Sequence, residues 1–227
     1  MKISTWNVNS VNARIEHLEK FIKQDQSDIY LLQELKTIED GFPKEIIKNI
    51  GYIPYVNGQK AWNGVAILSK DPLNITNTLI PKYDDPNARF IETEIKLKKI
   101  KKNIKLINIY LPNGNPIETE KFDYKIEWMK KFNNYILDLK DKNTPIIIAG
   151  DFNVIPSDDD VYSPENYKND ACAHPLTREQ YRILINMGFT DLVKHFVAGK
   201  TNWTFWGYRG GGWQKGNGLR IDHFLTT

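Results

Sequence analysis

The chain has 227 residues, a hydrophobic fraction of 41%, a charged fraction of 26% and a formal net charge of +3. These values are ordinary for a globular protein and exclude a disordered or a fibrous class. The length is sufficient for one large α/β domain with a sizeable core. The small positive charge permits contact with phosphates, but it is well below that of a nucleic-acid coat protein.

Cys172 is the one cysteine of the sequence, so an internal disulfide and a cysteine-rich zinc site are both excluded. An inert thiol is its simplest interpretation. No apolar run approaches the ~18 residues of a membrane span, and the N-terminus has the pattern of a strand rather than of a cleavable leader. We therefore expect a cytoplasmic protein without a membrane anchor.

The beginning of the chain has the pattern of a β-α-β unit. Residues 2–8 are predicted as a buried strand, and residues 11–24 carry apolar side chains at helical spacing. Residues 27–33 include the run Ile-Tyr-Leu-Leu, which is typical of a strand that is covered on both faces. Glu34 follows this strand directly.

Further strands and helices are predicted along the rest of the chain. The strands are at residues 52–57, 64–69, 75–79, 90–97, 104–110, 145–149 and 220–225, and the helices are at residues 44–50, 122–139 and 178–187. Thr177 is predicted to cap the last helix at its N-terminus, with Gln180 three residues later, and Gly188 to end it. The lysine-rich segment 98–103 is predicted as a solvated hairpin tip. We expect a single domain over residues 1–227 with sheets packed between helices.

Polar residues recur where the predicted strands end. They are Asn7, Glu34, Tyr110, Asp151 with Asn153, and Asp222. Strand ends present side chains on a rigid scaffold, where binding chemistry often collects. Each residue alone is more simply a turn residue or a solvated strand end. Together, however, their carboxylate and carboxamide oxygens suit Mg²⁺ or Mn²⁺, and phosphoryl transfer is the natural use of such an ion.

Six short motifs, in order along the whole chain, carry a resemblance to a known family. They are Thr-Trp-Asn-Val-Asn-Ser at residues 5–10, Leu-Gln-Glu at 32–34, Asn-Gly-Val-Ala-Ile-Leu-Ser at 63–69, Asn-Ile-Tyr-Leu-Pro-Asn-Gly at 108–114, Gly-Asp-Phe-Asn at 150–153 and Arg-Ile-Asp-His at 220–223. The chain resembles the exonuclease III and abasic-site (AP) endonuclease family of the endonuclease/exonuclease/phosphatase superfamily. The resemblance implies a four-layer α/β sandwich, in which two packed mixed β-sheets are flanked by helices.

The same resemblance implies roles for the residues at the matching positions. The implied metal ligands are Asn7, Glu34, Asp151 and Asn153, and the implied catalytic residues are Tyr110, Asp151, Asn153 and Asp222. Tyr110 would touch the scissile phosphate or help to place the nucleophile. Asp151 would orient or deprotonate the attacking water, or protonate the leaving group. Asn153 would stabilise the transition state, and Asp222 would orient a histidine.

Double-stranded DNA, especially at abasic sites and 3′ ends, is the partner that the resemblance implies. The residues predicted to contact DNA are Asn113, Phe205, Trp206, Arg209, Trp213, Lys215, Leu219 and Ile221. Aromatic side chains beside Arg and Lys can stack on bases or sugars and neutralise phosphates, and in this family the region resembles a pocket for a flipped abasic sugar. The alternative is that several of these aromatic residues belong to the core, with about even odds for Trp206. We expect a monomer.

The resemblance breaks at the end of the chain. The family continues past the Arg-Ile-Asp strand to a Ser-Asp-His-x-Pro motif, which does not occur in this sequence, so we expect the final strand and its Asp-His pair to be missing. His223 is a tempting substitute, but neighbouring strand residues point to opposite faces, which predicts a packed or surface histidine. Two alternatives therefore remain beside the repair nuclease: a catalytically impaired DNA-binding remnant, and a phosphoesterase that acts on RNA or a small phosphoester.

Overall fold

The computed structural model describes residues 1–96, 103–140, 144–197, 202–207 and 210–227. The chain divides into two compact units that are interleaved along the sequence. Unit 1 comprises Met1–Tyr110 and Asn143–Asp151, and unit 2 comprises Leu111–Lys142 and Phe152–Thr227. The single domain over residues 1–227 stays a prediction, and each unit is described by itself.

The first sheet of unit 1 is mixed and has the strand order β1-β2-β4-β3. Its strands are β1 (Ile3–Asn7), β2 (Ile29–Gln33), β3 (Ile53–Asn57) and β4 (Val65–Ser69). Strand β1 pairs with β2 in parallel, and the other pairs are antiparallel. All residues of β2 and β4 are buried, which confirms the prediction that the strand before Glu34 is covered on both faces.

A second row of strands in unit 1 has the order β5-β6-β7-β8. Its members are β5 (Asn74–Asn77), β6 (Phe90–Lys96), β7 (Asn103–Tyr110) and β8 (Ile146–Asp151). Strands β5, β6 and β7 pair antiparallel, whereas β7 and β8 are parallel, and the last residue pair of this ladder is Tyr110 opposite Asp151. Apart from Asn103, the predicted hairpin tip at residues 98–103 lies outside the described residues.

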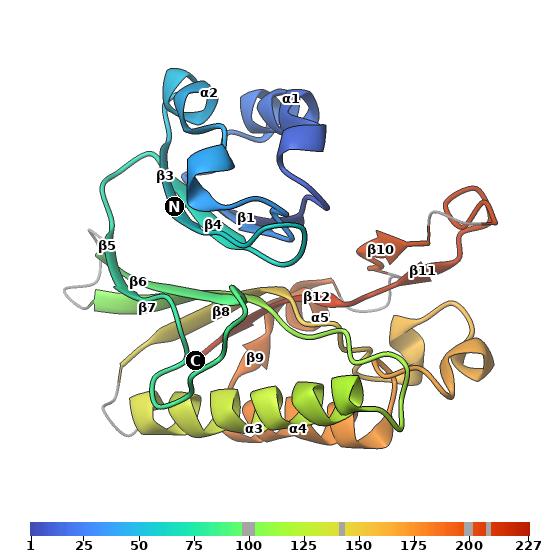
Figure 1. Cartoon of the computed structure of the whole chain (residues 1–227). Helices are drawn as coiled ribbons and strands as arrows, with labels where there is room; N and C mark the ends of the chain where they lie inside the picture. The colour runs from blue at the N-terminus through green and yellow to red at the C-terminus, as the bar shows by residue number, and fades with distance from the viewer. Residues whose placement is uncertain (97–102, 141–143, 198–201, 208–209) are drawn as a thin grey trace. The chain divides into compact units, whose positions relative to one another are not determined.

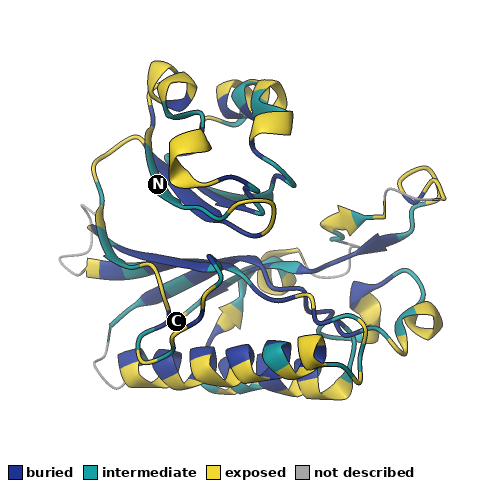
Figure 2. Ribbon diagram, in the orientation of Figure 1, coloured by how far each residue is buried: buried dark blue, intermediate teal, exposed yellow. Residues whose placement is uncertain are grey.

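Helices cover the outer face of the first sheet, and strands β6 and β7 contact its inner face (Figure 1). The short 3₁₀ turn η1 (Asn12–Arg14) leads into α1 (Ile15–Asp25), and η2 (Glu39–Gly41) precedes α2 (Lys44–Asn49). Helix α1 buries Leu18 and Ile22 in the core and leaves its opposite face exposed, as expected for an amphipathic helix (Figure 2). The predicted β-α-β start of the chain is therefore confirmed.

Unit 2 contains the longest helix, α3 (Glu120–Lys140), which contacts α4 (Pro175–Asn186). Its other elements are short: η3 (Asp158–Asp160), η4 (Pro164–Tyr167), β9 (Thr190–Asp191), α5 (Leu192–Phe196), β10 (Phe205–Trp206), β11 (Gly218–Leu219) and β12 (Asp222–Thr226). Strand β12 pairs antiparallel with β9, and β10 pairs antiparallel with β11. Among the helices of the described ranges, none is long and apolar enough to cross a membrane.

The predicted cap of helix α4 is wrong by three residues. His174 is the N-cap, since its side chain accepts a hydrogen bond from the Leu176 amide, and Pro175 occupies the first turn. Pro at the first helical position is favourable because its missing N–H would have no partner there. The Thr177 hydroxyl donates to the Ala171 carbonyl instead, at 2.7 Å. Gly188 follows the last turn with a φ of +94°, as predicted for the C-terminal end.

Candidate functional site

Three strand ends of unit 1 bring polar side chains together. The side-chain amide of Asn7, at the end of β1, donates to Glu34 Oε2 at 3.0 Å and to Asp151 Oδ2 at 2.9 Å. Asn7 and Asp151 are the last residues of β1 and β8, and Glu34 directly follows β2. The structure thus places three of the predicted site residues in one hydrogen-bonded group.

The main chain at Glu34 leaves the strand in the left-handed region, with a φ of 58°. Such a conformation is uncommon for a residue with a side chain and needs support from its surroundings. The Ser10 amide donates to the Glu34 carbonyl at 2.8 Å, and the Leu35 amide donates to the Gly64 carbonyl at 3.2 Å. A Cβ at Gly64, whose φ is +88°, would lie 2.9 Å from the Leu35 Cβ. Gly64 of the 63–69 motif therefore leaves room for Leu35, the residue that follows Glu34.

Lys36 is a member of this group that sequence reasoning missed. Its ammonium lies 2.9 Å from Glu34 Oε1 and donates to Asn9 Oδ1 at 2.6 Å. It also lies 5.9 Å from the ring centroid of Trp62, a side chain that is 69% exposed. Lys36 has a φ of 55°, so two left-handed residues within three positions turn its side chain back toward Glu34. In the sequence, only its position two residues after Glu34 could have indicated that Lys36 belongs to this group.

Tyr110 ends β7 opposite Asp151 and is held as a neutral phenol. Burial is the largest cause that raises the pKa of Tyr110, and the negative charges of Asp151 and Glu34 raise it further. The guanidinium of Arg89, 5.0 Å from the Tyr110 ring centroid, acts in the opposite direction without outweighing them. A neutral phenol beside carboxylates can donate a hydrogen bond to an anionic substrate oxygen.

The donor atoms of this group fit a hard divalent cation. Glu34 and Asp151 both accept from the same Asn7 nitrogen, so the two carboxylates are close enough to face one small ion. Within the described residues, no group of three or more His, Cys, Asp or Glu side chains is arranged to hold a metal. An ion would therefore combine these two carboxylates with amide, water and substrate oxygens, as magnesium sites commonly do.

Two further predicted residues meet in unit 2. Asn113 Nδ2 donates to Asn153 Oδ1 at 3.1 Å, and Asn153 Nδ2 donates to the Leu111 carbonyl at 2.9 Å. The Cys172 sulfur is buried and lies 3.8 Å from the Asn113 amide and 3.9 Å from Asn153 Oδ1. The two asparagines are thus held as one hydrogen-bonded pair, although they lie in different loops.

Asp222 and His223 point to opposite faces of β12, as the alternation of a strand requires. Asp222 is half-buried, whereas His223 is 1% exposed. Arg220 donates to His223 Nδ1 at 2.8 Å, so the other ring nitrogen carries the proton and donates to the Val154 carbonyl at 2.9 Å. Of the two predicted alternatives, a packed or a surface histidine, this contact set shows the packed one.

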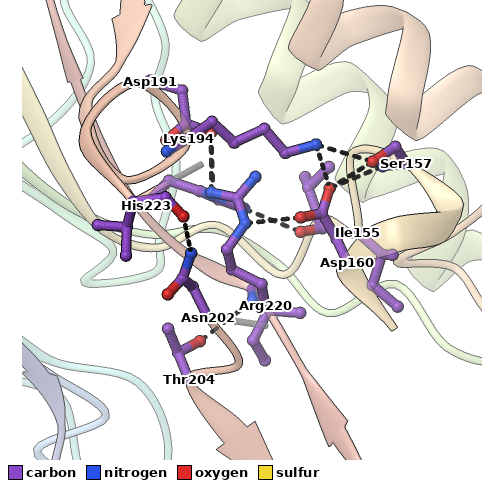
Figure 3. Close-up of polar contacts among 12 residues, drawn as sticks. Ile155, Ser157, Asp160, Asp191, Lys194, Asn202, Thr204, Arg220 and His223 are labelled. Atoms are coloured by element: carbon purple, nitrogen blue, oxygen red, sulfur yellow. Dashed lines mark hydrogen bonds and ion pairs between the residues drawn. The ribbon is translucent and has the colours of Figure 1, made fainter. Parts of the chain in front are cut away.

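Arg220 is the centre of a buried ion-pair network around His223 (Figure 3). Its guanidinium lies 2.8 Å from Asp160 Oδ1 and 2.8 Å from Asp191 Oδ2. Burial alone would raise the pKa of Asp160, but the hydrogen bond and charge of Arg220 outweigh it and lower that pKa to about 2. Burial, together with the Arg220 charge, lowers the pKa of His223 to about 4. This network joins β12 to η3 and β9, although Nη2 of Arg220 is buried without a hydrogen-bond partner among the described residues.

We expect His223 to make stability dependent on pH between about 6.5, its ordinary pKa, and the folded value of about 4. In this window the unfolded state binds a proton that the folded state does not. The free energy of unfolding should therefore decrease as the pH is lowered through this window, by at most about 1.4 kcal/mol per pH unit from this group. Denaturant unfolding at pH 7, 6 and 5 measures it. His223→Gln should flatten the slope relative to His17→Gln, which changes an exposed histidine; equal slopes would contradict the assignment.

The residues predicted to contact DNA divide into exposed and buried sets in unit 2. Trp213 is 68% exposed and Phe205 is 36% exposed, and Lys215 is exposed as well. Trp206 is half-buried and meets Trp213 edge to face, with ring centroids 4.5 Å apart. Leu219 and Ile221 are buried in a small core with Ile155, Val161 and Cys172. Arg209 lies outside the described residues, and the role of the whole set stays a prediction.

Comparison with known proteins agrees with the fold and with these motifs. A family model described as the endonuclease/exonuclease/phosphatase family matches residues 4–227. Exodeoxyribonuclease III of Haemophilus influenzae is 34% identical over 240 residues, which cover 100% of this chain and 88% of that protein. The exodeoxyribonuclease of Bacillus subtilis is 30% identical over 235 residues, with coverage of 100% and 88%.

Two solved structures are similar over 100% of this chain, each with a TM-score of 0.92. One is the 3′ phosphatase NExo from Neisseria bound to a product DNA hairpin, at 33% identity and 86% coverage of that chain. The other is an AP endonuclease from Archaeoglobus fulgidus, at 32% identity and 86% coverage. The two mixed sheets with flanking helices, predicted as an α/β sandwich, are confirmed by this match. The chain belongs to the endonuclease/exonuclease/phosphatase family, in its exonuclease III and AP endonuclease group, where metal dependence is typical.

Proposed function

We propose that the protein is a DNA repair nuclease that hydrolyses duplex DNA 5′ to abasic sites and removes nucleotides or blocking groups from 3′ ends. The observation that carries the proposal is the hydrogen-bonded group of Asn7, Glu34 and Asp151 at strand ends of unit 1. The relatives support the same chemistry, since two are named exodeoxyribonucleases and one solved neighbour is an AP endonuclease. Base excision repair is the process in which both activities are used.

Mg²⁺ or Mn²⁺ is the cofactor that we propose for this group, with Glu34 and Asp151 as charged ligands and Asn7 as a supporting one. When bound, such an ion polarises the phosphate and stabilises the leaving oxygen. Lys36 would hold the Glu34 carboxylate in place through its 2.9 Å ion pair. The neutral Tyr110 phenol would donate to a phosphoryl oxygen or help to place the nucleophile.

Asp151 is the residue that we propose for proton transfer. Its carboxylate accepts from Asn7 at 2.9 Å and can orient or deprotonate a water, or protonate the leaving group. Asn153 would donate from its side-chain amide to the charge that develops on the phosphoryl oxygens, and Asn113 would contact DNA beside it. Asp222, on the opposite face of β12 from His223, would orient a histidine.

The DNA contacts in this proposal come from the exposed aromatic and basic residues of unit 2. Trp213 and Phe205 would stack on bases or sugars, and Lys215 would neutralise a phosphate. Leu219 and Ile221 would form part of the apolar pocket for a flipped abasic sugar, next to Trp206. We further infer a location in the cytoplasm, because the lone buried Cys172 suits a reducing compartment. We also infer that the protein is a monomer. Light scattering would then give a mass near 26.4 kDa.

Metal removal is the direct test of this function. A duplex with one abasic analogue should be incised 5′ to that site when Mg²⁺ is present. In EDTA, incision should fall to the no-protein background, because without the cation the negative carboxylates of the site repel the phosphate. Excess Mg²⁺ or Mn²⁺ should restore it. Equal cleavage with and without EDTA would rule the proposal out. Binding without incision would favour the DNA-binding alternative, and failure of abasic duplex to compete would favour RNA or a small phosphoester as substrate.

A further inference from the structure

Lys125 is a charged side chain that is fully buried in unit 2. It lies on helix α3 with an exposed fraction of 0%, whereas the other side chains that this helix buries are mostly apolar, such as Trp128 and Phe132. Lysine is almost never fully buried unless its ammonium has partners, because desolvation of a charge is unfavourable. Its position therefore calls for an account of what the ammonium contacts.

The ammonium of Lys125 donates to two main-chain carbonyl groups from different loops. It lies 3.1 Å from the carbonyl oxygen of Asn113 and 2.6 Å from that of Asn153. These are the two asparagines whose side chains are joined by the 3.1 Å hydrogen bond from Asn113 Nδ2 to Asn153 Oδ1. The lysine thus holds the backbone of the pair, while the side chains of the pair hold each other.

Backbone geometry shows that both loops are shaped around this lysine. Asn153 has a φ of 48°, in the left-handed region that residues with side chains seldom adopt, and its carbonyl makes the shorter bond to Lys125. Gly114, directly after Asn113, has a φ of +86°, and a Cβ there would lie 2.5 Å from the Lys125 Cδ. Only a glycine lets this loop lie against the aliphatic stem.

We propose that Lys125 is a positioning residue for the nuclease reaction, which sets the orientation of Asn113 and Asn153 by holding their carbonyl groups. This inference rests on the proposed function, in which both asparagines act on the DNA phosphate or sugar. Lys125 itself touches no substrate, because it is completely buried. Loss of its ammonium leaves the buried Asn153 carbonyl and the partly buried Asn113 carbonyl without this donor and releases the left-handed turn at Asn153.

Kinetics on the abasic duplex separate positioning from simple stabilisation. Lys125→Met should lower kcat about 10- to 100-fold while KM changes less than about threefold, because a small displacement of a catalytic group reduces the rate more than it reduces binding. Lys125→Arg and Lys125→Gln keep a donor and should recover part of kcat. Lys130→Met, an exposed lysine of the same helix, should match the unchanged protein. Full kcat in folded Lys125→Met, with only a lower melting temperature, would overturn the proposal.

A second readout does not depend on turnover. The side-chain amide NMR signals of Asn113 and Asn153 should move in Lys125→Met, should move less in Lys125→Arg, and should stay in place in Lys130→Met. Unmoved signals in folded Lys125→Met would overturn the inference. If Lys125→Met does not fold, Lys125→Gln is compared with the unchanged protein instead: a partly reduced kcat with shifted amide signals is expected, and full kcat with unmoved signals would overturn the inference. If the unchanged protein does not incise abasic DNA, the proposed function fails, and the NMR comparison still decides whether Lys125 positions the pair.

Discussion

Replacing Asp151 with asparagine is expected to lower kcat for abasic-site incision by about 10²- to 10⁴-fold, the usual contribution of a positioned proton-transfer group. Asp151 is 4% exposed at the end of β8, and its Oδ2 accepts the 2.9 Å hydrogen bond from Asn7. Asparagine has nearly the same size, so the packing should stay, whereas the charge and the ability to take a proton are lost. Single-turnover incision under saturating Mg²⁺ measures the effect on the chemical step.

The same substitution should leave DNA binding intact or make it slightly tighter, because it removes a negative charge near the phosphate. Fluorescence anisotropy with the abasic duplex in Ca²⁺ measures binding without the need for turnover. Asp71→Asn is the matched control, since Asp71 is exposed in the turn after β4 and should retain full activity. A kcat for Asp151→Asn within tenfold of the unchanged protein would remove Asp151 from the proposed chemistry.

The residues at strand ends were predictable because their placement depends on local rules. Asn7, Glu34 and Asp151 each follow an apolar run, and neighbouring parallel strands bring their C-terminal ends to one edge of a sheet. The pairs β1 with β2 and β7 with β8 are indeed parallel in unit 1. The alternation of strand residues was equally local, which is why the placement of His223 on the face opposite Asp222 could be predicted, whereas its burial could not.

Residues that depend on contacts distant in sequence could not be predicted. Lys36 reaches Glu34 only because of two left-handed residues, and no strand or helix period predicts such a turn. The position of Lys125 in a predicted helix does not indicate burial, because its ammonium is held by carbonyl groups of two loops that are distant in sequence. The partners of Arg220 lie 60 and 29 residues before it in the sequence, in the short elements η3 and β9. Tertiary packing decides each of these cases.

Asn108 is a further residue whose role appears only in the folded unit 1. It lies on β7 with an exposed fraction of 0%. Its side-chain amide donates to the Leu32 carbonyl at 3.0 Å and to the Ala66 carbonyl at 2.9 Å, and its oxygen accepts from Gln33 at 2.7 Å. Leu32 and Ala66 face each other on β2 and β4. One asparagine thus links the second row of strands to the middle of the first sheet.

Asn108→Leu is expected to lower the free energy of unfolding by about 3–5 kcal/mol, although leucine fits a buried strand in volume and polarity. The change leaves the Leu32 and Ala66 carbonyl groups without this donor, and each buried unsatisfied group costs about 1–3 kcal/mol. The Gln33 amide loses one acceptor but keeps Thr5 Oγ1 and the Leu31 carbonyl. A melting temperature about 10 °C lower follows for a chain of this size. Asn103→Leu on the same strand, where the side chain is exposed, should change stability by less than about 0.5 kcal/mol. If denaturant unfolding gave similar values for both variants, ordinary apolar packing would be sufficient to hold the two layers of unit 1 together. A selective loss at Asn108 would instead show that its hydrogen bonds are needed to join them.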